Sequence, residues 1–339
     1  MHRDVTISIT NYNGAATLTP VIQALLKQDY QGIKEIILAD NASTDDSIAL
    51  AKREFPSVRI ASNPDNRGPN PARNLGIQEA KTDLVLVMDN DIIFEPNYVS
   101  LLASVLNDNP EVGAVSGQIR LYGEPDVVQY TGANIHYAGA VVNNKIYSKL
   151  PVKVACVSAG AVLLDRQKAL TAGRYDEDLV FGWEDGDFTF RLTMLGYPCY
   201  VMSTAICYHM KQKRESRWFR YQVRNRWWFV IKNYDTWTLI ILLPGILFYQ
   251  LMIFGYCAMK GKMLDYIVGT AQAMAGLSAI ARKKAKLRLL KKCRDSEILT
   301  AEPIDSSGEQ TQKGIGGAIS RISNFILYLY WLPARCIIR

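Results

Sequence analysis

Two acidic residues stand close together at a point in the chain where they could hold a metal ion. Asp89 and Asp91 flank Asn90 directly after the apolar run 84–88. Side chains at this spacing on an extended chain point to the same side. Hard cations such as Mg²⁺ and Mn²⁺ prefer oxygen ligands and leave positions open for substrate phosphates. The alternative is a plain turn, in which Asp and Asn bond to their own backbone.

A second acidic group lies at 183–187, where the sequence reads WEDGD at the start of a predicted helix. Acidic residues complement a helix N-terminus without any catalytic purpose. Three acidic residues within the four positions 184–187 are more than the start of a helix needs. A carboxylate here, near a bound metal, could take a proton from an incoming hydroxyl as a general base. His209, one of three histidines, is either a structural residue or a further metal ligand.

Two further segments could bind a nucleotide. Asp40 ends the apolar run 35–39, where its carboxylate could accept a hydrogen bond from a base. Arg73 lies in the segment 66–74, a loop running into a helix start, which suits an anion. The sequence has no G-x-G-x-x-G after its first predicted strand and no G-K-[ST]. Dinucleotide cofactors and P-loop chemistry are therefore disfavoured.

Alternating strands and helices must position these groups. Alternating or apolar patterns predict strands at 4–10, 35–39, 58–62 and 84–88, and helical periodicity with start signals predicts helices at 17–28, at 45–54 and from Pro71 onward. This rhythm predicts a parallel sheet covered by helices on both faces, with its ligand crevice at the carboxyl ends of the strands. Residues 113–164 are less regular and are interpreted as an insertion. A helix is expected over 184–195.

The net charge of +7 over 339 residues is divided unevenly. Residues 1–210 hold 24 Asp and Glu against 17 Lys and Arg, whereas residues 211–294 hold 18 Lys and Arg against 3 acidic residues. The acidic first part argues against nucleic acid as a partner. The basic block suits an anionic membrane surface.

The cysteine pattern and the start of the chain favour a reducing compartment. The six cysteines include no C-x-x-C pair, so neither a disulfide framework nor a zinc knuckle is indicated. Residues 5–9 alternate like a strand and do not form the apolar core of a signal peptide. We expect the first domain to lie in the cytosol.

The remainder of the chain predicts membrane association. Residues 237–259 are 23 residues without a charge, enough to cross a bilayer; the alternative is a buried core helix. Basic residues on both sides favour a hairpin or an in-plane element over a single crossing. The expected organisation is a catalytic domain at 1–212, a basic amphipathic connecting helix at 213–235, a transmembrane or re-entrant segment with a basic juxtamembrane helix at 236–294, a linker at 295–317 and an interfacial helix at 318–339.

The order and spacing of the motifs resemble those of family 2 glycosyltransferases, whose catalytic domain has the GT-A fold. The resemblance covers about residues 4–230 and is closest to the rhamnosyltransferase-like, non-processive branch. Residues 221–225 depart from the Gln-x-x-Arg-Trp element of processive synthases. The matching segments are 9–14, 40–45, 66–68, 72–76, 89–91, 173–177, 182–187 and 208–209.

The resemblance implies a role for each matching residue. Asp40 would contact the nucleobase, with Asn11, Arg73, Asp89 and Asn90 completing the nucleotide-sugar site. The remaining motifs would supply the metal ligands, the base and the acceptor site: Asp91, with Asp89 and His209, would hold Mn²⁺ or Mg²⁺, Asp185 would be the catalytic base, and Trp183, Glu184 and Asp187 would shape the acceptor site.

The predicted function is an inverting glycosyltransferase at the cytoplasmic face of the inner membrane. Its donor would be a nucleoside-diphosphate sugar, and its acceptor a lipid-linked or membrane-proximal saccharide. Two alternatives stay open: a sugar-1-phosphate nucleotidyltransferase, and a non-enzymatic membrane scaffold with a basic lipid-binding segment. The sequence gives no oligomeric state.

Overall fold

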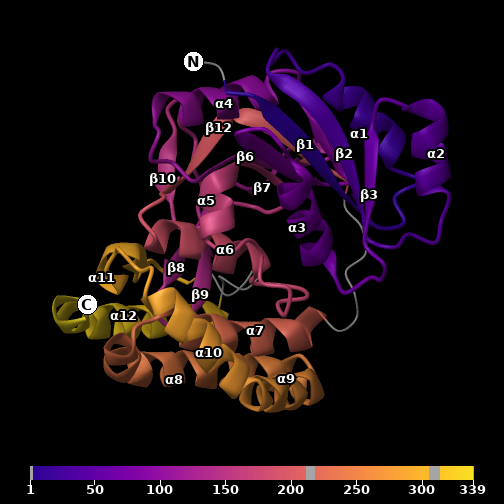
Figure 1. Ribbon diagram of the computed structural model, residues 1–339. Helices are drawn as coiled ribbons and strands as arrows, with labels where there is room; N and C mark the ends of the chain where they lie inside the picture. The colour runs from indigo at the N-terminus through magenta and orange to yellow at the C-terminus, as the bar shows by residue number, and fades with distance from the viewer. Residues whose placement is uncertain (1–2, 211–217, 305–313, 339) are drawn as a thin grey trace. The chain divides into compact units, whose positions relative to one another are not determined.

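The structure is a computed structural model that describes residues 3–210, 218–304 and 314–338 (Figure 1). Contacts within the chain divide it into two units. Unit 1 comprises residues 1–132 and 144–214, and unit 2 comprises residues 133–143 and 215–339. Each unit is described by itself.

Unit 1 is built on a ten-stranded mixed sheet with the order β10-β12-β6-β11-β4-β1-β2-β3; β5 pairs with β12, and β7 with β6. The parallel half consists of β3, β2, β1 and β4. In the other half β11 runs antiparallel to both β4 and β6. The strands are β1 (Val5–Asn11), β2 (Ile33–Asp40), β3 (Arg59–Ser62), β4 (Leu84–Asp89), β5 (Ile92–Phe94), β6 (Ala114–Leu121), β7 (Glu124–Tyr130), β10 (Val152–Val154), β11 (Ala161–Asp165) and β12 (Cys199–His209).

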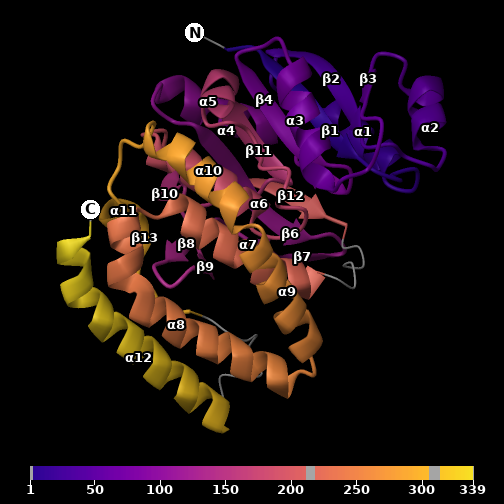
Figure 2. The same ribbon diagram turned by 60° about the horizontal axis from the view of Figure 1, so that its bottom comes forward.

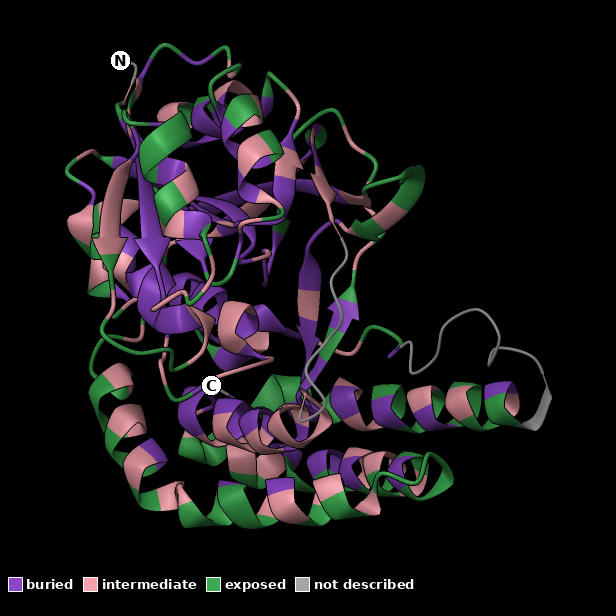
Figure 3. Cartoon of the chain, turned by 90° about the vertical axis from the view of Figure 1, so that its right-hand side faces the viewer, coloured by how far each residue is buried: buried purple, intermediate pink, exposed green. Residues whose placement is uncertain are grey.

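Helices cover both faces of this sheet, as expected. The apolar side chains of α1, α2 and α4 join one core with alternate residues of β1 and β4, while α3 lies against the opposite face of β1. Every residue of β1 is buried, which fits a strand covered on both sides (Figure 3). The helices of unit 1 are α1 (Leu18–Leu25), α2 (Ser47–Glu54), α3 (Pro69–Glu79), α4 (Tyr98–Asp108), α5 (Arg166–Thr171) and α6 (Glu184–Met194).

One close approach fixes α3 on the sheet. Gly76 faces Ser8 of β1, and a Cβ atom at residue 76 would lie 1.7 Å from the Ser8 Oγ atom. Only a residue without a side chain lets the helix come this near. Because α3 also carries Arg73, this contact sets the depth at which that guanidinium enters the site.

Residues 113–164 do not form a single insertion. β6, β7, β10 and β11 of this range belong to the central sheet, whereas residues 133–143 belong to unit 2. The pairing of β11 between β4 and β6 joins residues far apart in sequence, so no local pattern revealed it. The first domain expected at 1–212 therefore includes residues 133–143, which belong to unit 2.

Unit 2 combines six helices of the described residues with a three-stranded sheet. The helices are α7 (Trp218–Asn233), α8 (Thr236–Met259), α9 (Met263–Ala275), α10 (Leu277–Arg288), α11 (Asp295–Ile298) and α12 (Gly314–Ile337); the strands are β8 (Ala133–His136), β9 (Ala140–Asn143) and β13 (Leu299–Thr300). Helix α7 contacts α9 and α10, and α12 runs beside α8 (Figure 2).

The buried side of α7 carries a cation. Arg226 donates through Nε to the Gly139 carbonyl at 2.9 Å, and through its two terminal nitrogens to the Ala138 carbonyl and to Gln250 Oε1, both at 2.6 Å. The guanidinium also lies over the Tyr249 ring. These contacts join residues 133–143 to α7 and α8, which explains why that excursion belongs to unit 2.

Part of the expected linker at 295–317 is ordered structure. Asp295 begins α11 and accepts a hydrogen bond from the Lys291 ammonium at 2.7 Å, and β13 pairs with β8. Ile298 and Leu299 are buried there, so this stretch packs like a folded element. Residues 305–313 of the expected linker, and 213–217 of the expected connecting helix, lie outside the described residues.

Among the described residues, α8 is the one helix long and apolar enough to cross a membrane. Its most apolar window has a mean hydropathy of 2.0, and 28% of that window is buried. Residues 263–281 lie in two helices, α9 and α10, which meet at Gly276 beside the Trp228 ring.

Candidate active site

The parallel strands bring three polar residues to one edge of the sheet. Asn11 is in register with Asp40, and Thr10 with Asp89. The buried Asn11 amide nitrogen donates to Asp40 Oδ1 at 2.8 Å, and its oxygen accepts from Asn90 Nδ2 at 2.8 Å. The ends of β1, β2 and β4 are thus tied together by a hydrogen-bonded chain, as the spacing of the motifs predicts.

Asp40 is buried and already bonded within this edge. Its Oδ1 accepts from Asn11 and from the Ser43 hydroxyl, and its Oδ2 accepts from the Ser43 backbone N–H at 3.0 Å. Ser43 therefore closes the turn after β2 and does not cap α2, which begins at Ser47. A carboxylate offers about four lone-pair positions, so Asp40 keeps capacity for one more donor.

Arg73 lies at the centre of the site. The side chain comes from α3 and is 6% exposed. Its Nη2 atom donates to both oxygens of Asp89, at 3.1 and 3.2 Å, and its Nη1 atom lies 3.8 Å from Glu184 Oε1. Burial opposes the charge of the guanidinium, but Asp89 and Glu184 outweigh it and raise the pKa of Arg73. The site therefore holds a permanent cation between two carboxylates.

Two further neighbours orient Arg73. Asn70 Oδ1 accepts from Nη1 at 3.2 Å, and the guanidinium stands 5.6 Å from the centre of the Tyr175 ring. The Asn70 amide in turn donates to the Leu179 carbonyl at 2.7 Å. Among the described residues the Arg73 Nε atom is buried without a partner, so one donor of this cation remains to be satisfied.

A strained turn presents Glu184 and Asp185 at the start of α6. Gly182 and Trp183 both have positive φ, 81° and 68°. A left-handed conformation is unusual for an aromatic residue and is concentrated at functional sites. Trp183 is 7% exposed, so its ring is packed into the protein. The turn holds both carboxylates in the first turn of the helix.

Burial perturbs these two acids. It raises the pKa of Glu184 to about 7, and the neighbouring Asp185 charge adds to this effect. Burial also raises the pKa of Asp185, although hydrogen bonds from the Gly186 and Ala159 backbone and the charge of Arg73 oppose it. Burial therefore favours the protonated form of both acids, and it brings the pKa of Glu184 close to neutral pH.

Asp187 does not face the site. Its side chain is fully buried and forms an ion pair with Arg191 at 3.0 Å, one turn along α6. The same arginine bonds to the carbonyl of Arg174. A carboxylate enclosed in this way anchors the helix to the segment before it, so the structure does not bring Asp187, expected at the acceptor site, together with Glu184 and Asp185.

Asp91 and His209 form a separate pair. The Asp91 Oδ2 atom lies 3.3 Å from His209 Nε2, because β5 and β12 pair antiparallel with Ile92 opposite His209. Gln129 Oε1 lies 2.9 Å from the other ring nitrogen. Asp89 is turned to Arg73 instead. The described residues contain no group of three or more His, Cys, Asp or Glu side chains arranged to hold a metal ion.

A comparison with protein families decides the identity of unit 1. The model described as "Glycosyl transferase family 2" matches residues 6–167. This range holds Asn11, Asp40 and Asp89 from the strand ends described above, together with Arg73 of α3 and Asp91. Residues 6–167 are therefore a glycosyltransferase family 2 domain.

Curated relatives of this family 2 glycosyltransferase match part of the chain. The poly-beta-1,6-N-acetyl-D-glucosamine synthase of Staphylococcus aureus is 25% identical over 206 residues, which are 60% of this chain and 49% of that protein. The succinoglycan biosynthesis protein ExoO of Rhizobium meliloti is 30% identical over 136 residues, 37% of this chain and 39% of that protein. The chain thus matches about half the length of such relatives or less.

Solved structures confirm the GT-A fold of the glycosyltransferase. The mannosyltransferase PcManGT from Pyrobaculum calidifontis, in complex with GDP-Man and Mn²⁺, superposes with a TM-score of 0.53 at 18% identity, covering 86% of each chain. The expected fold class, a mainly parallel sheet with helices on both faces, is therefore confirmed.

The site of this glycosyltransferase includes residues that the sequence did not single out. Asn70 and Tyr175 orient Arg73, and the loop before β11 borders Asp89: a Cβ atom at residue 160 would lie 3.0 Å from Asp89 Oδ2. Asn70 belongs to the segment 66–74, which the sequence indicates as an anion site, so the sequence could have identified Asn70 as a site residue. Gly160 lies in the range interpreted as an insertion, where no local motif marks it.

Proposed function

We propose that the chain transfers a sugar from a nucleoside-diphosphate sugar to an acceptor hydroxyl, with inversion at the anomeric carbon. The observation that carries this proposal is the position of Arg73, buried between Asp89 and the Glu184–Asp185 pair. A buried cation beside two acids of raised pKa suits a reaction in which a diphosphate leaves and a hydroxyl loses its proton.

The donor end of the site is the edge formed by Asn11, Asp40 and Asn90. Their mutual hydrogen bonds fix the amide and carboxylate groups before any ligand arrives. Asp40 would accept from the base, which is compatible with uracil, thymine or guanine. The GDP-Man complex of the mannosyltransferase, which shares the fold, supports a nucleotide sugar as donor.

Asp91 and His209 are the residues that would hold a divalent cation, either Mn²⁺ or Mg²⁺. They fit because one carboxylate and one imidazole already converge, and a cation that also binds substrate phosphates needs few protein ligands. When bound, the ion would neutralise charge on the departing diphosphate. The Mn²⁺ in the mannosyltransferase complex supports this proposal.

The chain's own groups account for the remaining steps. Arg73 would attract the diphosphate through the donor that is unpaired in the described residues. Asp185 would accept the proton of the attacking hydroxyl as its oxygen bonds to the anomeric carbon, while the bond from that carbon to the diphosphate oxygen breaks and the diphosphate keeps the electron pair. One displacement with one base gives inversion. Glu184 and Trp183 would border the acceptor.

The acceptor we propose is a lipid-linked or membrane-proximal saccharide, reached from the cytoplasmic face of the inner membrane. Helix α8 supports this proposal by its length and hydropathy. The names of both curated relatives refer to the synthesis of a polysaccharide.

A panel of UDP-, dTDP- and GDP-sugars tests the proposal. We expect one base to raise the melting temperature of the full-length protein in the presence of Mn²⁺, and the same donor to be turned over with release of the nucleoside diphosphate. Release of pyrophosphate from a nucleoside triphosphate and a sugar phosphate would show a nucleotidyltransferase instead. An absence of stabilisation by every donor would contradict the proposal.

A further inference from the structure

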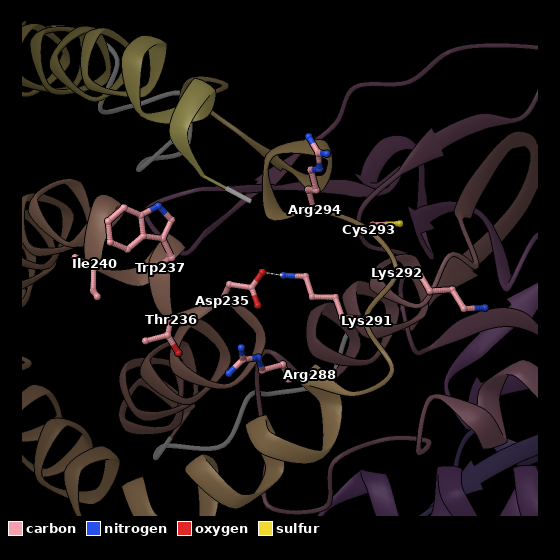
Figure 4. A pocket seen from close by; sticks show the side chains of 9 residues that line it. All are labelled: Asp235, Thr236, Trp237, Ile240, Arg288, Lys291, Lys292, Cys293 and Arg294. Carbon is pink, nitrogen blue, oxygen red and sulfur yellow. Dashed lines mark hydrogen bonds and ion pairs between the residues drawn. The ribbon is translucent and has the colours of Figure 1, made fainter.

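Unit 2 contains a basic cavity that the transfer reaction does not use. It has a volume of about 580 Å³ and lies where the segment after α10 meets the start of α8 (Figure 4). Four basic side chains and one carboxylate are among its lining residues, which are Asp235, Thr236, Trp237, Ile240, Arg288, Lys291, Lys292, Cys293 and Arg294. The excess of cations indicates an anionic ligand.

An ion-paired cluster holds the cavity open. The Lys291 ammonium lies 2.7 Å from both Asp235 Oδ2 and Asp295 Oδ1. The Asp235 backbone N–H donates to the other oxygen of Asp295 at 2.8 Å. Because the Asp295 side chain is fully buried, this cluster fixes the segment after α10 against Asp235, the residue that precedes α8. The cavity is therefore preformed.

Two arginines of the cavity keep their charge uncompensated. Lys291 is neutralised by its two acidic partners, but no carboxylate of the described residues forms an ion pair with Arg288 or Arg294. Both arginines are exposed to solvent. In Figure 4 the Arg288 guanidinium lies on the side of Asp235 and Thr236. Planar guanidinium groups in this state are suited to phosphate oxygens.

The other wall of the cavity is apolar and continues beyond it. Trp237 and Ile240 are 49% and 58% exposed, and further apolar side chains follow every three to four residues along one face of α8. That spacing places them on a single stripe. The rest of the stripe comprises Leu243, Leu247, Leu251 and Phe254, all exposed. A hydrocarbon chain leaving the cavity would run along it.

From this combination we infer that the cavity binds the phosphate headgroup of a membrane lipid, with Arg288 on the phosphate and Trp237 and Ile240 against the start of the lipid chain. The Arg294 guanidinium points away on the other side of the Asp235–Lys291 pair (Figure 4) and adds positive charge there. A soluble phosphate would satisfy Arg288 but would leave the apolar stripe uncovered. Tryptophan at the end of an apolar helix, next to basic residues, is typical of the lipid headgroup level. The inference depends on the membrane association proposed above and not on sugar transfer.

Lipid binding to the full-length protein in detergent micelles tests this site. Native mass spectrometry would compare phosphatidic acid, whose headgroup is a phosphate monoester, with zwitterionic phosphatidylcholine. We expect the wild type to prefer phosphatidic acid, and the double variant Arg288→Gln/Arg294→Gln to lose about tenfold or more in affinity for it. Arg288→Lys/Arg294→Lys keeps both charges and should retain most of the binding.

The matched control is Arg282→Gln/Lys286→Gln. It removes the same charge from exposed positions of α10 that do not line the cavity, and its affinity should stay within about twofold of the wild type. Equal losses in the two double variants would show a diffuse basic surface and overturn the proposal. The melting temperatures of all variants establish that they are folded.

Two further measurements separate the sources of phosphate and the two proposals. Glycerol phosphate and inorganic phosphate should fail to displace phosphatidic acid at equal concentration, and displacement by either would show a site for soluble phosphate and overturn the lipid assignment. Stabilisation by the nucleotide donor should be the same in the cavity variants as in the wild type. Failure of sugar transfer would therefore leave the lipid result unaffected, and the reverse also holds.

Discussion

Replacement of Glu184 by Gln should stabilise the protein at high pH and leave it unchanged at low pH. Burial raises the pKa of Glu184 to about 7 from the ordinary value of 4.5. A raised carboxyl pKa means that folding favours the protonated form, so stability is fully present below about pH 4.5 and falls as the pH rises through 7. The uncharged amide of the variant would mimic the protonated acid at every pH.

The size of the effect follows from the two pKa values. Their difference corresponds to at most about 3 kcal/mol above pH 8. The pKa of Glu184 also depends on the charges of Asp185 and Arg73, and the Glu184 side chain is 16% exposed. We therefore expect about half of the maximum, roughly 1–2 kcal/mol. For a unit of this size that corresponds to a rise of about 3–6 °C in melting temperature.

The assay is the melting temperature of full-length wild type and Glu184→Gln between pH 5 and 8.5, in one detergent and at one ionic strength. The difference between them should be smallest at pH 5, grow as the pH rises to about 7 and level off above about pH 7.5. Glu111→Gln is the matched control, because Glu111 is exposed on the surface of unit 1; its difference from wild type should not change with pH. A Glu184→Gln difference that is constant across this range, or larger at pH 5, would refute the reasoning.

Three other substitutions address the fold and the donor site. Gly76→Ala places a Cβ atom 1.7 Å from Ser8 Oγ and should cost about 1–3 kcal/mol; adding Ser8→Gly should restore part of the melting temperature, and no restoration would contradict the contact. Arg73→Lys loses the two-oxygen contact with Asp89 and should weaken donor binding about tenfold, by calorimetry; unchanged affinity would contradict the role of Arg73. Asp91→Ala should abolish the Mn²⁺-dependent part of donor stabilisation in a thermal-shift assay, and its persistence would refute the metal assignment.

The parallel half of unit 1 was predictable because its signals are local. Each strand there is a short apolar or alternating run, and β1, β2 and β4 each end on a polar residue. Since parallel strands end at the same edge, the sequence order alone brings Asn11, Asp40 and Asp89 together. The motifs are short local patterns of the same kind, and their order and spacing were enough to indicate the family.

The other half of the sheet could not be predicted in this way. β11 pairs with β4 and β6, and β12 with β6, so the partners lie tens of residues apart and no turn signal joins them. Residues 133–143 belong to unit 2 because the backbone carbonyls of Ala138 and Gly139 accept hydrogen bonds from Arg226, which lies almost 90 residues later in the chain. Long-range pairings of this kind are fixed by the packed fold.

Side-chain partners within the site were the least predictable feature. The sequence treated the acids of 184–187 as one group, but Asp187 pairs with Arg191 while Glu184 faces Arg73. The spacing of Asp187 and Arg191, four residues apart on a helix, is a signal that could have separated Asp187 from its neighbours. The contact of Asp89 with Arg73 had no such signal, because it joins a strand end to a different helix.

The most direct test of the central proposal is single-turnover sugar transfer by Asp185→Asn. The amide cannot accept the proton of the acceptor hydroxyl, so the rate should fall by about 10²–10⁴-fold, while donor affinity stays within about threefold. Asp108→Asn, at an exposed position in the last turn of α4, is the control and should transfer at the wild-type rate. Near-wild-type transfer by Asp185→Asn with normal donor binding would contradict the assignment of Asp185 as the base.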